Sequence, residues 1–296
     1  MGTEDSTTMM LIFVSWLLSY SVNVHAHPAL KPKVIYGLDH RHELFEEPDP
    51  AIRILATSTV ALIETKDLYE SEHAFHLSAK TFGEEFGLCP NERYAYQPAG
   101  AFCSGFLIAP DLVVTAGHCL PEKQDCANTA FVFGYSYKNQ DSMPDLIAKH
   151  DVYTCRRLIV SKEKSSGIDF ALVKLDREVV GRTPLAFRSH GQVRRGDPLL
   201  VIGHPGGIPA KIAGGGHVRD SREKHTFVAN LDVVSGNSGS PVFNFLTHEV
   251  EGILVGGEED FIKTREGCHV SLRCTNNDCV GEEVVRTTSV LPYLNL

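Results

Sequence analysis

The sequence predicts an all-β protein, built either as a sandwich or as a pair of barrels. Short apolar segments recur along the chain between turn signals. Glycine (25 residues) and proline (15 residues) are plentiful, as in turn-rich β proteins. The chain has 296 residues, of which 43% are hydrophobic, so it can bury one large core or two small ones.

The expected elements follow one another with few helices. Only residues 77–88 are expected to form a helix in the first half, and SVLPYL near the end predicts a terminal helical turn. Strands are expected at 58–64, 101–109, 111–119, 129–137, 156–160, 169–175, 198–203, 225–231, 240–246, 250–257 and 282–288. HPGG (204–207) and GGGH (214–217) are interpreted as a turn and a loop, and HPGG lacks the Lys and Ser/Thr of a phosphate-binding loop.

A polar stretch at 187–197 divides these segments and is expected to connect two halves, about 51–186 and about 197–292. The net charge of −9 and the lack of a basic stripe argue against nucleic acid as a partner. The sequence does not indicate an oligomeric state.

Residues 1–26 are predicted to be a secretory signal peptide. Residues 9–22 are an apolar run, and VHA at 24–26 supplies a small-residue cleavage site. Glu4 and Asp5 before the run are atypical and are consistent with initiation at Met9 or Met10. The alternative is an uncleaved membrane anchor, although spanning a bilayer takes about 20 apolar residues. We therefore expect a secreted, extracellular protein with no membrane segment in its mature form.

The even number of cysteines is expected to form disulfides in an oxidising compartment. The eight are Cys89, Cys103, Cys119, Cys126, Cys155, Cys268, Cys274 and Cys279. The last three lie close to His269, but their spacing lacks the CxxC pairs of structural zinc sites. No metal or other cofactor is therefore expected.

Three motifs carry the groups that nucleophilic serine catalysis requires. LVVTAGHCL places His118 at the end of an apolar strand, SSGIDFALVKL places Asp169 at the start of another, and SGNSGSP places Ser238 in a glycine-rich turn. A histidine oriented by a carboxylate can take the serine proton. Taken singly, His118 is better explained as a core histidine, Asp169 as a strand-start carboxylate and SGNSGSP as a linker. Their combination favours catalysis.

TAGHC, IDFALVKL and GNSGSP, in this order, resemble the chymotrypsin-like serine protease family. GNSGSP is most similar to the V8-like, glutamyl endopeptidase-like branch. The resemblance extends from about Val34 to Pro292 and implies a double β-barrel with the active site between the barrels. Ser238 would then be the nucleophile, His118 the general base and acid, and Asp169 the residue that fixes the histidine tautomer.

The same resemblance implies an oxyanion hole from the N–H groups of Gly236 and Ser238, and a disulfide between Cys103 and Cys119. The expected activity is hydrolysis of a polypeptide through an acyl-enzyme. The alternative is a catalytically inactive secreted binding protein, a pseudoprotease on the same fold.

Specificity is predicted from Asp232, six residues before Ser238. An aspartate at that spacing in trypsin-like members pairs with a substrate Arg or Lys, so we hypothesise cleavage after these residues. The alternative is that Asp232 ends a strand and caps the turn. Glutamyl specificity is disfavoured, because Leu254 and Val233 replace the histidine and threonine that the glutamyl endopeptidases use.

Activation is expected to differ from that of trypsin-like zymogens, because the uncharged Asn237 stands where these have an aspartate. VIYG after Lys33 resembles a mature V8-like N-terminus. Residues 27–33 are therefore interpreted as a short propeptide and 34–296 as the protease domain. The alternative is an unstructured leader.

Overall fold

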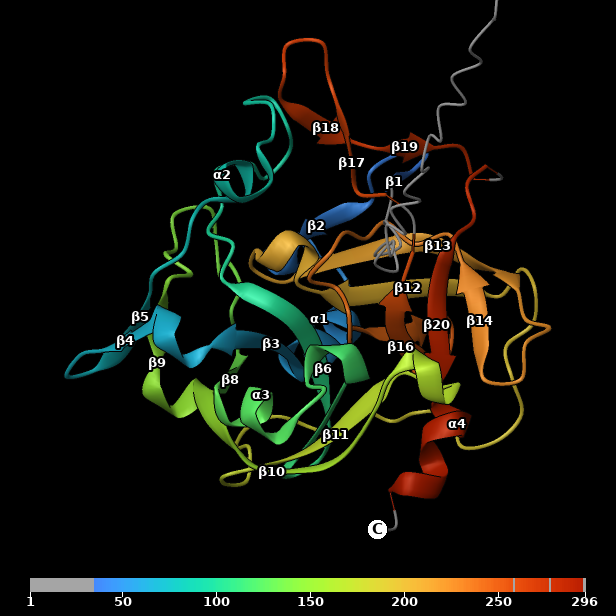
Figure 1. Ribbon diagram of the computed structural model, residues 1–296, viewed down its shortest axis with the longest axis horizontal. Coiled ribbons are helices and arrows are strands. Elements are labelled where there is room, and N and C mark those ends of the chain that lie inside the picture. Colours follow the sequence, from blue (N-terminus) through green and yellow to red (C-terminus); the bar gives the residue numbers. More distant parts are fainter. Residues whose placement is uncertain (1–34, 258, 277, 295–296) are drawn as a thin grey trace, which may run out of the picture. The chain divides into compact units, whose positions relative to one another are not determined.

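The computed structural model describes residues 35–294 apart from 258 and 277 (Figure 1). The predicted signal peptide, the predicted propeptide and Val34 lie outside the described residues. Among the described residues, no helix is both long enough and apolar enough to cross a membrane.

Strands dominate the described part of the chain. The strands are β1 (Ile35–Tyr36), β2 (Arg41–Glu43), β3 (Thr59–Glu64), β4 (Leu68–Glu70), β5 (Ala74–Leu77), β6 (Ala101–Ala109), β7 (Leu112–Thr115), β8 (Thr129–Phe133), β9 (Leu146–Ala148), β10 (Val152–Lys162), β11 (Phe170–Leu175), β12 (Pro198–Gly203), β13 (Lys211–Asp220), β14 (Thr226–Ala229), β15 (Pro241–Asn244), β16 (Val250–Gly256), β17 (Phe261–Lys263), β18 (His269–Ser271), β19 (Arg273–Cys274) and β20 (Glu282–Arg286).

Helices are short. The α-helices are α1 (Pro50–Thr57), α2 (Phe82–Phe86), α3 (Lys123–Ala127) and α4 (Thr287–Val290). The 3-10 turns are η1 (Leu44–Glu46), η2 (Thr65–Asp67), η3 (Gly117–Cys119), η4 (Lys149–Asp151), η5 (Lys164–Ser166), η6 (Pro205–Gly207) and η7 (Leu291–Tyr293).

The first barrel is a closed sheet with the strand order β10-β11-β7-β6-β3-β8. Alternate residues of a strand face opposite sides of its sheet. Val60 and Leu62 of β3 accordingly join a cluster to which all strands of this barrel contribute, together with Phe131 of β8. Ala61 and Ile63 face the other way and pack against the small sheet of β4, β5 and β9. Because both faces of β3 are buried over residues 60–63, these four residues are all apolar and show no alternation in sequence.

The second barrel has the strand order β12-β15-β16-β20-β14-β13 and closes through the pairing of β12 with β13. β2 extends it by pairing with β13. Its inner cluster includes Leu199 and Val201 of β12, Phe227 of β14 and Leu254 of β16. The predicted all-β double barrel is confirmed.

The two barrels pack against each other through the faces that point away from their own interiors. Phe106 of β6, Val114 of β7 and Leu172 of β11 form one cluster with Leu200 of β12 and Phe243 of β15. Strands from both barrels therefore reach a shared, buried contact, and this contact fixes the loops at its border.

Disulfides join loops as well as strands. The four pairs are Cys89–Cys268, Cys103–Cys119, Cys126–Cys155 and Cys274–Cys279. The three C-terminal cysteines that lie near His269 in sequence are all used in these bonds. The Cys274–Cys279 bond lies next to β19, which pairs in parallel with β1.

The predicted helix at 77–88 is wrong in its extent, since α2 covers only Phe82–Phe86. Thr81 begins the helix: its Oγ1 accepts from the Glu84 N–H (3.2 Å), and the Glu84 Oε2 accepts from the Thr81 N–H (2.8 Å). Gly87, with φ +61°, ends it in the left-handed conformation. Residues 74–77 form β5 instead.

The sequence reading also missed α1 and α3. For α1 a signal was present, because Asp49 accepts a hydrogen bond from the Ala51 N–H (2.8 Å) and Pro50 occupies the first helical position. The interpretation of 214–217 as a loop is wrong, since these residues lie within β13. A Cβ at Gly216 would lie 2.5 Å from the Leu231 side chain, so close packing rather than looping explains this glycine.

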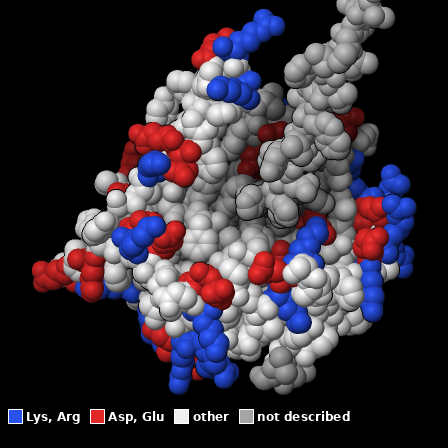
Figure 2. Space-filling view, in the orientation of Figure 1, with Lys and Arg blue, Asp and Glu red and all other residues white. Residues whose placement is uncertain are grey.

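Acidic and basic side chains are interspersed on the face of the molecule in Figure 2. Surface ion pairs include Lys149 with Glu70 (2.7 Å) and Lys174 with Asp111 (2.7 Å). Each such pair contributes about 0–1 kcal/mol to the free energy of unfolding. Most of that free energy is therefore expected to come from the buried clusters and the disulfides.

Candidate active site

His118, Asp169 and Ser238 lie at the border of the contact between the barrels. His118 is in η3 directly after β7, and Asp169 directly precedes β11. β7 and β11 are paired, with Thr115 opposite Ala171, so the end of one strand adjoins the start of the other. Ser238 precedes β15 of the second barrel.

The His118 ring is held by a buried carboxylate. Asp169 is 5% exposed, and its Oδ2 lies 2.8 Å from His118 Nδ1. Its Oδ1 accepts a hydrogen bond from the His118 backbone N–H (3.1 Å). With Nδ1 as the donor to this carboxylate, Nε2 is the nitrogen that can accept a proton. The arrangement suits His118 to act as a general base.

Gly117 allows this approach of backbone to carboxylate. A Cβ at Gly117 would lie 1.9 Å from the Lys162 carbonyl oxygen and 3.0 Å from Asp169 Oδ1. Any other residue would push η3 away from β10 and disturb the pair of His118 and Asp169.

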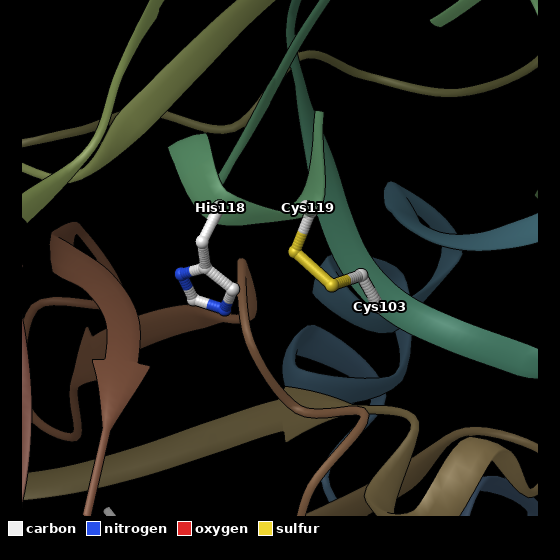
Figure 3. A group of neighbouring side chains, drawn as sticks. All are labelled: Cys103, His118 and Cys119. Carbon is white, nitrogen blue, oxygen red and sulfur yellow. A yellow bond between two sulfur atoms is a disulfide. The ribbon is translucent and has the colours of Figure 1, made fainter. Parts of the chain in front are cut away.

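The turn with Ser238 lies against the disulfide that flanks His118. Figure 3 shows His118 and Cys119 on one turn, with Cys119 bonded to Cys103 of β6. The Cys119 sulfur lies 3.8 Å from the Ser238 carbonyl oxygen, and the Ser104 N–H donates to that oxygen (2.8 Å). The side-chain nitrogen and sulfurs of His118, Cys103 and Cys119 lie within 4.8 Å of one another. The Cys103–Cys119 disulfide therefore lies next to both His118 and the turn that contains Ser238.

Most backbone donors of the serine turn are already used in hydrogen bonds to other backbone groups. The N–H groups of Asn237, Gly239 and Ser240 donate to carbonyl oxygens at 3.1, 2.7 and 2.9 Å. Within the described part of the chain, the Gly236 N–H donates no hydrogen bond. Gly236 has φ +89°, a conformation that glycine adopts without strain. Its N–H therefore remains available to a substrate oxygen.

Asn237 is buried within the second barrel. Its Oδ1 accepts a hydrogen bond from the Ser240 hydroxyl (3.2 Å), and a Cβ at Gly203 would lie 2.5 Å from the same atom. A neutral amide thus fills the position where the resemblance would place a charged aspartate.

Asp232 lies against the N-terminal segment. Its carboxylate accepts from the Tyr36 N–H (2.7 Å) and the His40 N–H (2.9 Å), and His40 Nδ1 lies 3.0 Å away. Burial raises the pKa of the Asp232 carboxyl, although the hydrogen bonds from His40 and Tyr36 oppose this shift. These contacts were not foreseen from the sequence. They make Asp232 an anchor for the segment that contains β1 and precedes β2.

A cavity of about 220 Å³ adjoins the serine turn. Ser235 and Gly236 line it together with Phe102, which precedes the disulfide-bonded Cys103 in the chain. Its other lining residues include the carboxylates Glu64, Asp67 and Glu85. Among the described residues, the lining includes Gly236 of the serine turn but neither Ser238 nor His118.

Two buried residues near the turn were missed by sequence reasoning. Ser104, which is 0% exposed, was read only as part of a strand, and its position directly after Cys103 was the one available signal. His204, in the turn after β12, stacks on Tyr135 with a centroid separation of 5.6 Å. Its Nδ1 lies 3.1 Å from the Ile208 carbonyl oxygen.

The neutral form of His204 is favoured by its surroundings. Nδ1 must donate to the Ile208 carbonyl, and Nε2 is buried without a hydrogen-bond partner among the described residues. A proton on Nε2 would be a buried charge without an acceptor. Burial accordingly lowers the pKa of His204 to about 3.

We expect the free energy of unfolding to depend on pH through His204. Between the ordinary histidine pKa of about 6.5 and the folded value, the unfolded chain binds a proton that the folded chain does not. This residue therefore lowers stability as pH falls through that window, by up to about 1.4 kcal/mol per pH unit. Urea unfolding at pH 4 to 7 should show a shallower dependence for His204→Phe. Unchanged dependence in that variant, matching the exposed control His73→Gln, would contradict this assignment.

Comparison with known proteins identifies the family to which the chain belongs. A family model described as a trypsin-like peptidase domain matches residues 103–253, a segment that contains His118, Asp169 and Ser238. A search of curated protein sequences gives no match. The chain resembles the structure of a Glu endopeptidase in complex with MPD, with 16% identity, a TM-score of 0.50 and coverage of 88% of this chain and 98% of that one.

A second similar structure is the active form of the Rv3671c protease from M. tuberculosis. It has 16% identity, a TM-score of 0.49 and coverage of 90% of each chain. The Glu endopeptidase likeness supports the double-barrel fold. Since the family model covers slightly more than half of the chain, this protein belongs to the trypsin-like peptidase domain family.

Proposed function

We propose that this chain is a secreted serine endopeptidase that acts through Ser238, His118 and Asp169. The observation that carries the proposal is the buried Asp169 carboxylate, which binds both the His118 backbone and its ring nitrogen. A carboxylate that makes both bonds fixes the orientation of the His118 ring. A histidine that only fills the core would not need such a partner.

In the proposed reaction, Ser238 Oγ attacks the carbonyl carbon of the scissile peptide bond while His118 Nε2 takes its proton. The oxyanion that forms accepts hydrogen bonds from the N–H groups of Gly236 and Ser238. His118 then gives the proton to the leaving amine, and an acyl-enzyme remains on Ser238. Water, deprotonated by His118, hydrolyses this ester and restores the enzyme.

Secretion is supported by the four disulfides, because such bonds persist in oxidising compartments. The apolar run at 9–22 supports the same proposal from the sequence.

Cleavage after Arg or Lys stays a prediction. Asp232 is the residue proposed to select these side chains, and it also holds Tyr36 and His40. Leu254 and Val233 belong to the apolar inner cluster of the second barrel, which is consistent with the argument against glutamyl specificity.

Labelling with a fluorophosphonate probe tests the nucleophile. We expect the probe to modify Ser238, as mapped by mass spectrometry, and labelling to vanish in Ser238→Ala. Ser189→Ala, which removes an exposed hydroxyl on the segment between the barrels, should be labelled like the wild type. Folded wild-type protein that takes no label would contradict the proposal and favour the inactive binding protein.

A further inference from the structure

We propose that Ser104 is a positioning residue that sets the geometry of the oxyanion hole. This inference rests on the proposed function, because it concerns how the N–H groups of Gly236 and Ser238 are presented to substrate. It gives a role to a residue on β6, a strand of the first barrel, in shaping a turn of the second.

Ser104 uses all of its polar atoms around the serine turn. Its hydroxyl donates a hydrogen bond to the Gly236 carbonyl oxygen (2.9 Å) and accepts one from the backbone N–H of His204 (3.0 Å). Its backbone N–H donates to the Ser238 carbonyl oxygen (2.8 Å). Its own carbonyl accepts from the Thr115 hydroxyl (2.6 Å). Since Ser104 is fully buried, water does not compete for these contacts.

The direction of the Ser104 hydroxyl is determined. Because the His204 N–H already donates to Oγ, the hydroxyl hydrogen must point to another acceptor, and the Gly236 carbonyl is that acceptor. His204 in turn is held by its stacking on Tyr135 and by the Ile208 carbonyl. The clamp is therefore anchored outside the serine turn.

These bonds fix the peptide groups on both sides of the one that carries the Ser238 N–H. The Gly236 carbonyl belongs to the peptide before it, and the Ser238 carbonyl belongs to the peptide after it. With both neighbours held by Ser104, the Ser238 N–H has one direction. The same bond to the Gly236 carbonyl restricts the backbone rotation of Gly236 (φ +89°), which as a glycine without a Cβ could otherwise adopt other conformations.

Loss of the hydroxyl would leave the peptide group between Gly236 and Asn237 held by the Asn237 N–H bond to the Val234 carbonyl (3.1 Å) alone, so we expect the Gly236 carbonyl to gain freedom to rotate. A carbonyl oxygen turned toward the substrate would put an acceptor where the oxyanion needs a donor. Removal of one oxyanion donor costs about 10²- to 10³-fold in kcat, so we expect an effect of this order. Binding of a peptide to its other contacts should change little, so kcat should fall while KM stays near its wild-type value.

Acylation by p-nitrophenyl acetate measures the step without knowledge of peptide specificity. In this reaction the bond from Ser238 Oγ to the acetyl carbon forms, the bond to p-nitrophenolate breaks, and the serine proton passes to His118. We expect Ser104→Ala to lower the acylation rate about 100-fold. Ser58→Ala is the matched control, since Ser58 is also buried and its hydroxyl donates to a backbone carbonyl, that of Thr183 (2.6 Å), which is not part of the serine turn.

A second pair of variants keeps the test valid where Ser104→Ala fails to fold. Ser104→Thr and Ser104→Val have the same shape and differ in the hydroxyl, so Thr should acylate about 100-fold faster than Val. KM and kcat on the best peptide from a random library complete the measurement. Equal rates for Thr and Val, or a Ser104→Ala rate within about threefold of wild type, would overturn the inference. A wild type that p-nitrophenyl acetate does not acylate would instead contradict the proposed function.

Discussion

Asp169→Asn should lower kcat about 10⁴-fold while the fold is retained. The expected cause is the tautomer of His118. The amide oxygen of the new side chain must face the His118 backbone N–H, which is always a donor and now bonds Oδ1 at 3.1 Å. The amide NH₂ then faces Nδ1, which must become the acceptor, so the proton moves to Nε2. A histidine with its proton on Nε2 cannot take the proton of Ser238.

The rate of hydrolysis of a peptide that the wild type cleaves measures the change in kcat, and circular dichroism measures whether the fold is retained. The control is Asp176→Asn, because the Asp176 Oδ1 also accepts a backbone N–H, that of Thr154 (2.9 Å), away from the candidate site. Activity of Asp169→Asn within tenfold of the wild type would show that the bond to His118 Nδ1 does not serve catalysis.

Gly239→Ala should both destabilise the protein and abolish its activity. Gly239 has φ +88°, and a Cβ there would lie 2.0 Å from the Ser104 carbonyl oxygen and 2.3 Å from Thr115 Oγ1. The left-handed conformation costs an alanine about 1–2 kcal/mol, and overpacking adds about 1–3 kcal/mol. The turn that carries Ser238 would move away from β6 and β7 to relieve these contacts.

Thermal unfolding and fluorophosphonate labelling of Gly239→Ala check both effects. Gly214→Ala provides the control, because no atom lies within 4 Å of a Cβ added there. Equal melting temperatures and labelling rates for the two variants would show that the turn tolerates displacement and that its packing is not essential.

The barrels were predictable because their strands are short, apolar and separated by turns. Strand limits such as 101–109 and 198–203 agree with β6 and β12, since each strand is mostly buried and mostly apolar and has a turn residue next to it. β13 was not predictable in this way. Its three successive glycines are not typical of a strand, and Gly216 is explained by its close contact with Leu231, a residue of a later segment that only the fold brings near.

The candidate site was predictable to the level of residue types. His118, Asp169 and Ser238 follow from motifs, but the contacts of Asp232 and Ser104 depend on chain segments far away in sequence. Asp232 bonds Tyr36 and His40, which lie more than 190 residues earlier in the chain, and Ser104 of the first barrel bonds the turn of Ser238. No local sequence pattern specifies the direction in which a carbonyl or a hydroxyl points. The contacts of Asp232 and Ser104 are therefore visible only in the folded structure.

Mass-spectrometric mapping of cuts in a diverse peptide library, with Ser238→Ala in parallel, tests the central claim most directly. The proposed function predicts cuts within peptides that disappear in Ser238→Ala. Cuts after Arg or Lys would support Asp232 as the selecting residue, and cuts elsewhere would retain the catalytic residues and reject that role. An uncut library, from folded protein starting at His27 and also from protein starting at Val34, would contradict the account.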